Sequence, residues 1–179
     1  MTATSIPLLA WPVRYRLLAL LLALLPLLGQ AQSTVLSGPT GSGKFGLSVT
    51  VLANGNYVVT DPDFSQGGMQ KVGAVHLYSG TTNALISSLT GSHANDQVGN
   101  TVKALANGSY VVSSPSWNDN RGAATWGSGT SGVAGPVSAA NSLVGASAGD
   151  AVGYGLTALP NGSYVVSSSD WDSSRGAAT

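Results

Sequence analysis

Short apolar stretches separated by turn-forming residues follow one another from Gly46 onward. Between Gly46 and Leu52 the side chains of Val49 and Val51 alternate with hydroxyl side chains, which is the two-residue period of a β-strand. Three further apolar stretches follow before residue 90. We therefore expect strands at residues 46–52, 57–60, 74–78 and 84–89.

The connections between these stretches are rich in turn-forming residues. Asn54-Gly55 lies between the first two stretches, and this pair favours a two-residue type I′ hairpin, whose central residues both need a positive φ. The adjacent Val58 and Val59 indicate that the second strand is buried on both faces, as between two packed sheets. Longer polar connections complete the unit, at residues 61–72, 79–83 and 91–96.

The same pattern occurs three times along the chain. The sequence Asn-Gly-x-Tyr-Val-Val begins at Asn54, Asn107 and Asn161, with spacings of 53 and 54 residues. Residues 104–125 match residues 158–179 at 16 of 22 positions. Repeats of about 20–50 residues are typical of solenoids, propellers and arrays.

Four short strands joined in sequence by turns form one blade of a β-propeller. We therefore predict an all-β fold of tandem four-stranded antiparallel blades. The differences in length between units fall in the loops. A β-solenoid is the alternative, but hairpin turns disfavour it because the coils of a parallel β-helix run parallel. The units occupy residues 45–97, 98–151 and, incomplete, 152–179.

The number of units raises a physical problem. A closed propeller needs about 4–8 blades, and the chain carries two units and part of a third. Strand edges and apolar surface would remain open. We expect the chain to be a fragment of a longer protein or to close by oligomerising. Residues 32–179 alone are expected to be marginally stable and prone to aggregate.

The first 31 residues have the layout of a secretory signal peptide. Arg14 and Arg16 precede a twelve-residue apolar block, Leu17–Leu28, and the small residues Gly29 and Ala31 fit a cleavage site after Ala31. A membrane span needs about 20 apolar residues, so we expect no stable span; an uncleaved signal anchor is the alternative. The sequence predicts a secreted or cell-surface protein.

The repeated unit resembles the FG-GAP repeat of integrin α-subunit β-propellers and of many secreted bacterial proteins. The resemblance rests on Phe45-Gly46-Leu47-Ser48-Val49, Val58-Val59-Thr60-Asp61-Pro62 and Gly73-Ala74-Val75-His76-Leu77-Tyr78. It implies a propeller of a secreted or surface protein. It does not carry over the family's calcium site, because the turn between the first two strands holds no acid and Ca²⁺ takes about 6–8 oxygen ligands.

Composition disfavours several classes of function. Charged residues make up 8% of the 179 residues, the formal net charge is +0, and the chain has no Cys and no Glu. A nucleic-acid partner is not expected, because no basic excess neutralises phosphates. Disulfide frameworks, cysteine-ligated metals and thiol nucleophiles are excluded. We expect no cofactor and no metal, and no catalytic constellation marks the chain as an enzyme.

Two polar features each allow a functional and a structural interpretation. Gly38–Lys44 matches the phosphate-binding pattern G-x-x-x-x-G-K, but Phe45 stands where a hydroxyl would ligate Mg²⁺, and a strand rather than a helix follows. Asp96 and Asp150 occupy one equivalent place, three residues before the glycine that opens a unit. We expect them to cap turns by accepting backbone hydrogen bonds; a cation site is the alternative.

The loop after the second strand supplies the candidate binding residues. Arg121 follows Trp117 by four residues, and the next unit repeats this as Trp171 and Arg175. Both residue types are enriched at interaction hot spots, so a ligand-binding ledge is one interpretation. The other, which we favour, is that the tryptophans pack between units, since Phe64 holds the equivalent place in the first unit.

Two remaining polar features receive structural interpretations. His76 and His93 are not repeated, and we expect them to be ordinary strand and loop residues. Asn107 and Asn161 begin Asn-Gly-Ser glycosylation sequons. The predicted hairpin turns explain both sequons without glycans.

Three hypotheses of function follow from these patterns. The first is a binding or adhesion module that presents variable loops, such as 65–72 and 127–136, on one rim to an extracellular protein or glycan. The second is an accessory or catalytic part of an extracellular hydrolase, since propellers also host enzymes. The third is a structural spacer. Other blades, from the same chain or from a homo-oligomer, are the expected partners in each case.

Overall fold

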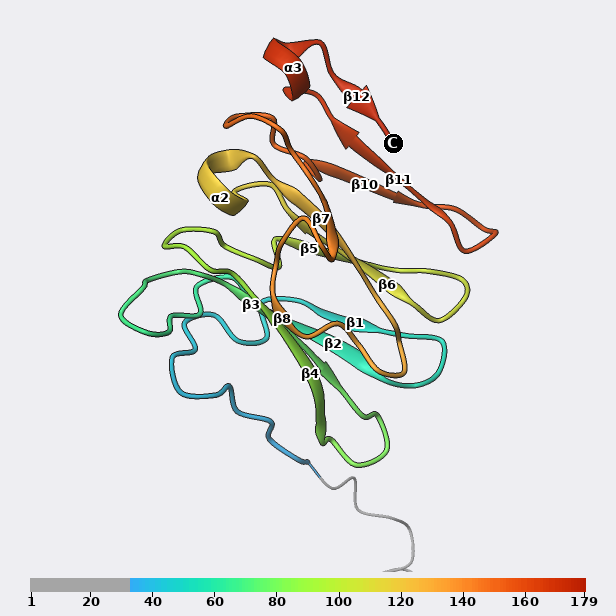
Figure 1. Cartoon of the computed structure of the whole chain (residues 1–179). Coiled ribbons are helices and arrows are strands. Elements are labelled where there is room, and N and C mark those ends of the chain that lie inside the picture. The colour runs from blue at the N-terminus through green and yellow to red at the C-terminus, as the bar shows by residue number, and fades with distance from the viewer. Residues whose placement is uncertain (1–32) are drawn as a thin grey trace, which may run out of the picture. The chain divides into compact units, whose positions relative to one another are not determined.

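A computed structural model describes residues 33–179 of the chain, and within it Leu36–Thr179 form one compact unit. The secondary structure is almost entirely β and is arranged in three successive sheets (Figure 1). This confirms the predicted all-β fold of tandem antiparallel sheets. The predicted signal peptide, with its cleavage site after Ala31, lies outside the described residues.

The first sheet contains the four strands expected from the first unit. Their order in space follows their order in the chain, and each pair is antiparallel. The observed bounds are β1 Val49–Val51, β2 Tyr57–Asp61, β3 Ala74–Tyr78 and β4 Leu85–Thr90. The sequence therefore located all four strands, although β1 is shorter than its alternating pattern.

The second and third units repeat this order of strands. The second sheet consists of β5 Thr101–Ala104, β6 Tyr110–Ser114, β7 Ala123–Gly127 and β9 Ser142–Val144. The third sheet consists of β10 Gly155–Ala158, β11 Tyr164–Ser168 and β12 Ala177–Ala178. Short helical turns precede the third strand of each, α2 Trp117–Asn120 and α3 Trp171–Ser174.

The turn between the first two strands differs from the predicted type I′ hairpin. Gly55 has a φ of +85° whereas Asn54 is not left-handed, and Gly55 N donates to Leu52 O over 3.0 Å. These bonds define a three-residue loop, a type I turn followed by a left-handed glycine. Asn54 accepts a hydrogen bond from Asn56 N instead of supplying a positive φ. Asn107 and Asn161 do the same in the later units.

The second strand of each unit is buried between sheets wherever a sheet lies on both sides. Val111 and Val112 are fully buried; Val112 belongs to the core shared with the first sheet, and Val111 to the core shared with the third. Val58 and Val59 are buried as well, as predicted. In the third unit Val166 is buried and Val165 is half-buried, because the described chain places no further sheet on that side.

Consecutive units contact each other through their backbones where the third strand of one unit begins. Gly73 pairs with Val98, and Gly122 pairs with Val152, each by a parallel bridge. Both glycines have a positive φ, 76° and 75°, and an added Cβ would collide with the backbone of the partner valine. Glycine is therefore required here by both conformation and space.

One element of the first sheet was not predicted. Strand β8, Gly135–Pro136, comes from the second unit and pairs in parallel with β4. The first sheet therefore has five strands, four from its own unit and one from the next. In Figure 1 the orange segment carrying β8 reaches back to the green strands of the first unit.

The outer face of the first sheet is covered by its own aromatic side chains. Tyr57 stacks on Tyr78 with ring centres 5.6 Å apart, and His76 lies between Phe45 and Phe64 at 5.9 and 6.2 Å. In the second unit Thr125 and Gly127 occupy the places of His76 and Tyr78. The first sheet packs against this face of the second sheet, so no aromatic cluster covers it. The aromatic cluster thus acts as a cap for the first unit.

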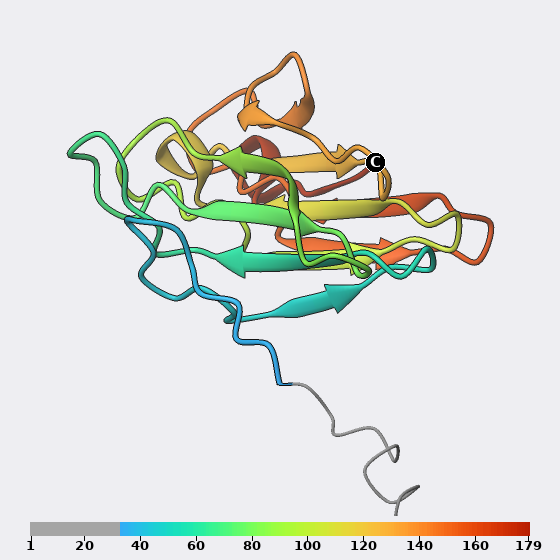
Figure 2. The same ribbon diagram turned by 90° about the horizontal axis from the view of Figure 1, so that it is seen from below.

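The connections gather at two opposite ends of the strands (Figure 2). The hairpin rim, as we name it, consists of residues 53–56, 79–83, 106–108, 128–134 and 160–162. The loop rim consists of residues 62–72, 91–97, 115–121, 145–151 and 169–175. Asn54 and Asn56 donate to Gly129 O on the first rim, and Gln97 N donates to Lys71 O on the second.

The expectation that loops 65–72 and 127–136 share one rim is therefore wrong. Loop 65–72 follows β2 and lies on the loop rim, whereas loop 127–136 follows β7 and lies on the hairpin rim. Each connection reverses the chain direction, so loops an odd number of strands apart end up at opposite ends.

No helix within residues 33–179 combines the length and apolar character that crossing a membrane requires.

Candidate functional site

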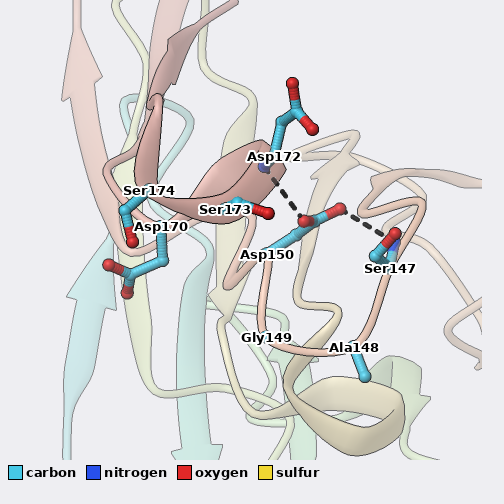
Figure 3. Close-up of a pocket in the computed structure, with 8 residues that line it drawn as sticks. All are labelled: Ser147, Ala148, Gly149, Asp150, Asp170, Asp172, Ser173 and Ser174. Atoms are coloured by element: carbon cyan, nitrogen blue, oxygen red, sulfur yellow. Dashed lines mark hydrogen bonds between the residues drawn. The ribbon is translucent and has the colours of Figure 1, made fainter.

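Two hollows occupy equivalent places on the loop rim. The first, of about 300 Å³, is lined by Ala94, Asn95, Gln97, Ser116, Asp119 and Asn120. The second, of about 260 Å³, lies one unit later and is lined by residues 147–150, Asp170 and residues 172–174 (Figure 3). Both lie between the connection from the previous unit and the short turn after the second strand. Their linings are polar but differ in sequence.

A buried aspartate holds each hollow in shape. Asp96 Oδ2 accepts hydrogen bonds from Ser92 N and His93 N, both over 2.8 Å, and its Oδ1 accepts one from Asn118 N over 2.9 Å. Asp150 does the same one unit later. Its Oδ2 accepts from Ser147 N over 2.8 Å and its Oδ1 from Asp172 N over 3.2 Å (Figure 3). The predicted turn-capping role is therefore confirmed, and each carboxylate also joins two loops.

These hydrogen bonds affect the titration of Asp150. The N–H of Ser147, followed by the N–H groups of Asp172 and Ala146 and the charge of Arg121, lowers the pKa of Asp150 from 3.8 against the opposing effect of burial. A depressed pKa in the folded state stabilises the fold above the unfolded value. That contribution is lost as the pH falls below 3.8.

The turn that each aspartate holds has an unusual backbone. Asn118, Asp119 and Asn120 have φ values of 47°, 57° and 58°, so three successive residues without a glycine are left-handed. The same three places in the third unit, residues 172–174, have φ values of 50°, 61° and 66°. Asn and Asp tolerate this region better than other residues. The Asn-Asp-Asn run after Trp117 is a sequence signal for this conformation, whereas the Asp-Ser-Ser run after Trp171 has only its first residue of the favoured type.

In the first unit a different aspartate holds the connection that precedes the first strand. Gly43 stands at the place of Asp96, and Asp61 supplies the carboxylate instead. Its Oδ1 accepts hydrogen bonds from Gly43 N over 3.2 Å and from Lys44 N over 2.7 Å. The final amides of the phosphate-loop-like segment 38–44 therefore bind a carboxylate of the same chain, and no helix follows them.

The two tryptophans of the predicted ledge lie in different environments. Trp117 is 7% exposed and belongs to the core between the first and second sheets, as the packing interpretation expects. Trp171 is 38% exposed. Arg121 donates to Ala146 O, and Arg175 pairs with Asp172 over 3.0 Å at the surface. Of these four candidates, Trp171 and Arg175 are accessible to a ligand, whereas the ring of Trp117 is not.

The other singled-out residues have structural partners. His76 is 3% exposed, and its Nδ1 shares a hydrogen bond of 2.8 Å with Ser88 Oγ. His93 is exposed and contacts Asp96 over 3.6 Å. The side-chain amide of Asn107 donates a hydrogen bond to Gly162 O. Within residues 33–179, no group of three or more acidic or histidine side chains is placed to hold a metal ion.

Repeated antiparallel sheets joined by carboxylate-held loops define an all-β repeat protein. A family described as a repeat of unknown function (DUF5650) matches the chain three times, at residues 51–100, 104–154 and 158–179. The chain belongs to this family. The three matches confirm the repeats inferred from the sequence. No curated protein matches the chain.

Proposed function

We propose that the chain is a binding module of a secreted or cell-surface protein, built as FG-GAP-like propeller blades, and that its loop rim binds an extracellular protein or glycan. One observation carries the proposal. The hollows at 94–120 and 147–174 share one framework but carry different polar side chains. Repeat proteins that bind ligands commonly combine a constant scaffold with variable loops.

The framework supports this role because it holds the loops rigidly. The left-handed turns are strained, and the hydrogen bonds of Asp96 and Asp150 hold them in place. Exposed side chains on these turns, such as Asp119 and Asp172, are then presented in fixed positions. A fixed polar surface loses little conformational entropy when it binds a ligand.

Binding is tested with residues 32–179 on an array of extracellular matrix proteins and oligosaccharides. We expect at least one saturable interaction. It should weaken at least tenfold in the double variant Asp119→Ala/Asn120→Ala or in Asp172→Ala/Ser173→Ala. The control is Thr130→Ala/Ser131→Ala, at exposed places on the hairpin rim, which should bind normally. Equal binding by all variants, or no saturable binding, would contradict the proposal and favour a structural spacer.

Export is tested separately with residues 1–31 fused to a phosphatase that is active only outside the cytoplasm. We expect activity, and an N-terminus at Gln32 after processing. The variant Leu22→Arg, in the centre of the apolar block, should abolish export. A fusion that remains in the cytoplasm would contradict the secreted assignment without affecting the binding test.

A further inference from the structure

Asp61 ends β2 and is the one aspartate in the chain that a proline follows. Its side chain is 0% exposed. Oδ1 accepts hydrogen bonds from Gly43 N over 3.2 Å and from Lys44 N over 2.7 Å. Oδ2 is equally buried but has no hydrogen-bond partner among the described residues. A carboxylate oxygen that is buried without a donor is less stable than one in water, so the fold leaves a reactive atom at this position.

The main-chain carbonyl of Asp61 accepts a hydrogen bond that favours attack by this oxygen. Phe64 N donates to Asp61 O over 3.1 Å. An N–H group at a carbonyl oxygen stabilises the negative charge that develops there when a nucleophile adds to the carbonyl carbon. Because Oδ2 and that carbon belong to one residue, their reaction closes a five-membered ring and needs no second molecule.

The peptide bond after Asp61 has a suitable leaving group. Pro62 is buried, and its nitrogen belongs to a tertiary amide without an N–H. Such a nitrogen accepts a proton more readily than the nitrogen of an ordinary peptide bond, and the bond to it then breaks. The equivalent places in the other units hold Ser114, which also precedes a proline, and Ser168, which does not. The combination of acid and proline therefore occurs in the first unit alone.

His76 supplies a second buried polar group beside this carboxylate. Because Asp61 pairs with Ala74 in the β2–β3 ladder, His76, two places further along β3, is its diagonal neighbour on one face of the sheet. His76 is 3% exposed. Its Nδ1 shares a hydrogen bond of 2.8 Å with Ser88 Oγ, and its Nε2 has no partner among the described residues. The imidazole can therefore carry a proton at Nε2 within the same buried cluster.

Mild acid changes the charge of this cluster. Burial lowers the pKa of His76 below 6.5, and the charge of Asp61 opposes this effect. The imidazolium form therefore becomes more abundant as the pH falls through mild acid. The other titratable, charged or polar groups around the pair are Tyr57 and Tyr78 on the sheet, the ion pair of Lys44 with Asp63 in the adjoining loops, and the uncharged Ser88 on β4.

We propose that Asp61 cleaves the peptide bond between itself and Pro62 in mild acid. Oδ2 of the ionised carboxylate forms a bond to the Asp61 carbonyl carbon. The bond from that carbon to Pro62 N then breaks, and the nitrogen takes a proton from the His76 imidazolium, which regains one from solvent. This leaves a cyclic anhydride at Asp61, which one water molecule opens to two carboxyl groups. The inference does not depend on the proposed function of the loop rim.

Cleavage produces two pieces that the sheet still holds together, because β2 remains paired with β3 along its length. Residues 32–179 are therefore kept at a pH of about 5 or about 7, denatured, and analysed by mass spectrometry. We expect a new N-terminus at Pro62, formed at least tenfold faster at the lower pH, where the imidazolium is more abundant. A chain that stays intact at both pH values would overturn the proposal.

A synthetic peptide of residues 57–66 contains the same Asp-Pro bond without the fold. The folded chain should be cleaved at least tenfold faster than this peptide at a pH of about 5, because only the fold supplies the buried oxygen and the Phe64 donor. Equal rates would show the ordinary acid lability of an Asp-Pro bond and would contradict the proposal. The bond between Ser114 and Pro115 is an internal control and should stay intact.

Variants test the nucleophile and the leaving group. Asp61→Asn keeps a side-chain acceptor for the two backbone amides, and Pro62→Ala keeps the whole Asp61 side chain. Both should fold, as circular dichroism checks, and both should stay intact. Asp63→Asn, on the other side of the proline, is the matched control and should be cleaved at the normal rate. Cleavage of Asp61→Asn at the normal rate would refute the proposal.

The proton donor and the anhydride have separate tests. His76→Thr should be cleaved more slowly and with little dependence on pH, whereas His93→Thr should behave like the unchanged chain. Hydroxylamine added during the incubation should be incorporated at Asp61 as a hydroxamate, because it opens the anhydride in place of water. Unchanged pH dependence in His76→Thr, or cleavage without incorporation of hydroxylamine, would count against the proposed chemistry and overturn it.

Discussion

At the scale of single residues, buried carboxylates organise this protein without forming a charged site. Asp61, Asp96 and Asp150 are each buried, and each accepts hydrogen bonds from backbone N–H groups. The donors to Asp96 and to Asp150 come from two segments each, whereas the donors to Asp61 are the adjacent amides of Gly43 and Lys44. At Asp96 and Asp150 the backbone amides bind both carboxylate oxygens and disperse the negative charge. The same residue type would have suggested metal binding if its partners were unknown.

Replacing Asp96 with alanine should destabilise the fold by about 3 kcal/mol. The change leaves the amides of Ser92, His93 and Asn118 without their acceptor, and losing hydrogen bonds to a buried charged group costs about 1.5–3 kcal/mol each, with partial recovery through water. Urea unfolding measures the effect. Asp170→Ala is the matched control and should change stability by less than about 0.5 kcal/mol, because Asp170 is an exposed loop-rim aspartate with a φ of −93° and no side-chain capping bond.

His76 should make the stability of the first unit sensitive to mild acid. Burial lowers the pKa of His76 below 6.5, although the charge of Asp61 opposes this. The unfolded chain then binds the proton more readily, so the free energy of unfolding should decrease as the pH falls from about 7 to about 5. His76→Thr introduces the residue found at the equivalent place in the second unit, and should flatten this dependence.

Chemical unfolding at several pH values checks this expectation. His93→Thr is the matched control, because the His93 side chain is 61% exposed, and it should retain the pH dependence of the unchanged chain. An unaltered slope in His76→Thr would show that the acid sensitivity has another origin.

At the scale of elements, residues 135–137 of the second unit, which we name the crossing segment, stabilise two sheets at once. Val137 fills the core between them while β8 extends the first sheet. Val137→Ala should therefore destabilise the chain by about 2 kcal/mol, through lost burial of two methyl groups and the cavity left behind. The same substitution at Val49, which is 57% exposed, should cost much less. Equal losses in the two variants would mean that the segment is held by β8 pairing alone.

The local patterns predicted the strands of the first unit but not the contacts between distant segments. The apolar stretches and turn residues located the bounds of β2, β3 and β4 within one residue, because the buried side chains of these strands are apolar and the turns between them are polar. The crossing strand β8 has two residues, one of them proline, so no local pattern marks it. The predicted type I′ turn was wrong because only the glycine of each Asn-Gly pair has a positive φ.

The candidate site shows the same division. Asp96 and Asp150 were correctly assigned as turn caps from their repeated position, because an aspartate beside a turn can accept hydrogen bonds from nearby backbone N–H groups. Their second contact, to the amides of Asn118 and Asp172, depends on a loop 22 residues away in each case. Trp117 is buried in a core that includes Val137 of the crossing segment, and the sequence did not predict that segment.

At the scale of the whole compact unit, stability should be unequal along the chain. Strand β6 is buried at all five positions between two sheets, whereas β11 is buried at two of five. Stacked repeats gain stability chiefly from contacts with their neighbours. Amide hydrogen exchange should therefore be slowest in β6 and faster by at least tenfold in β11, with the aromatic cap protecting β2.

Mass-spectrometric exchange on residues 32–179 measures this gradient directly. Uniform protection of β6 and β11 would show that the third unit is covered in solution by a surface that the single chain does not provide.

The crossing strand also sets an order of events during synthesis. A ribosome releases the chain from its N-terminus, so β1 to β4 emerge before Gly135 and Pro136. The first sheet cannot be completed until most of the second unit has followed it. Until then the edge of β4 is an open template for pairing with other chains. The nascent first unit is consequently the stage at which a chaperone would protect this protein most effectively.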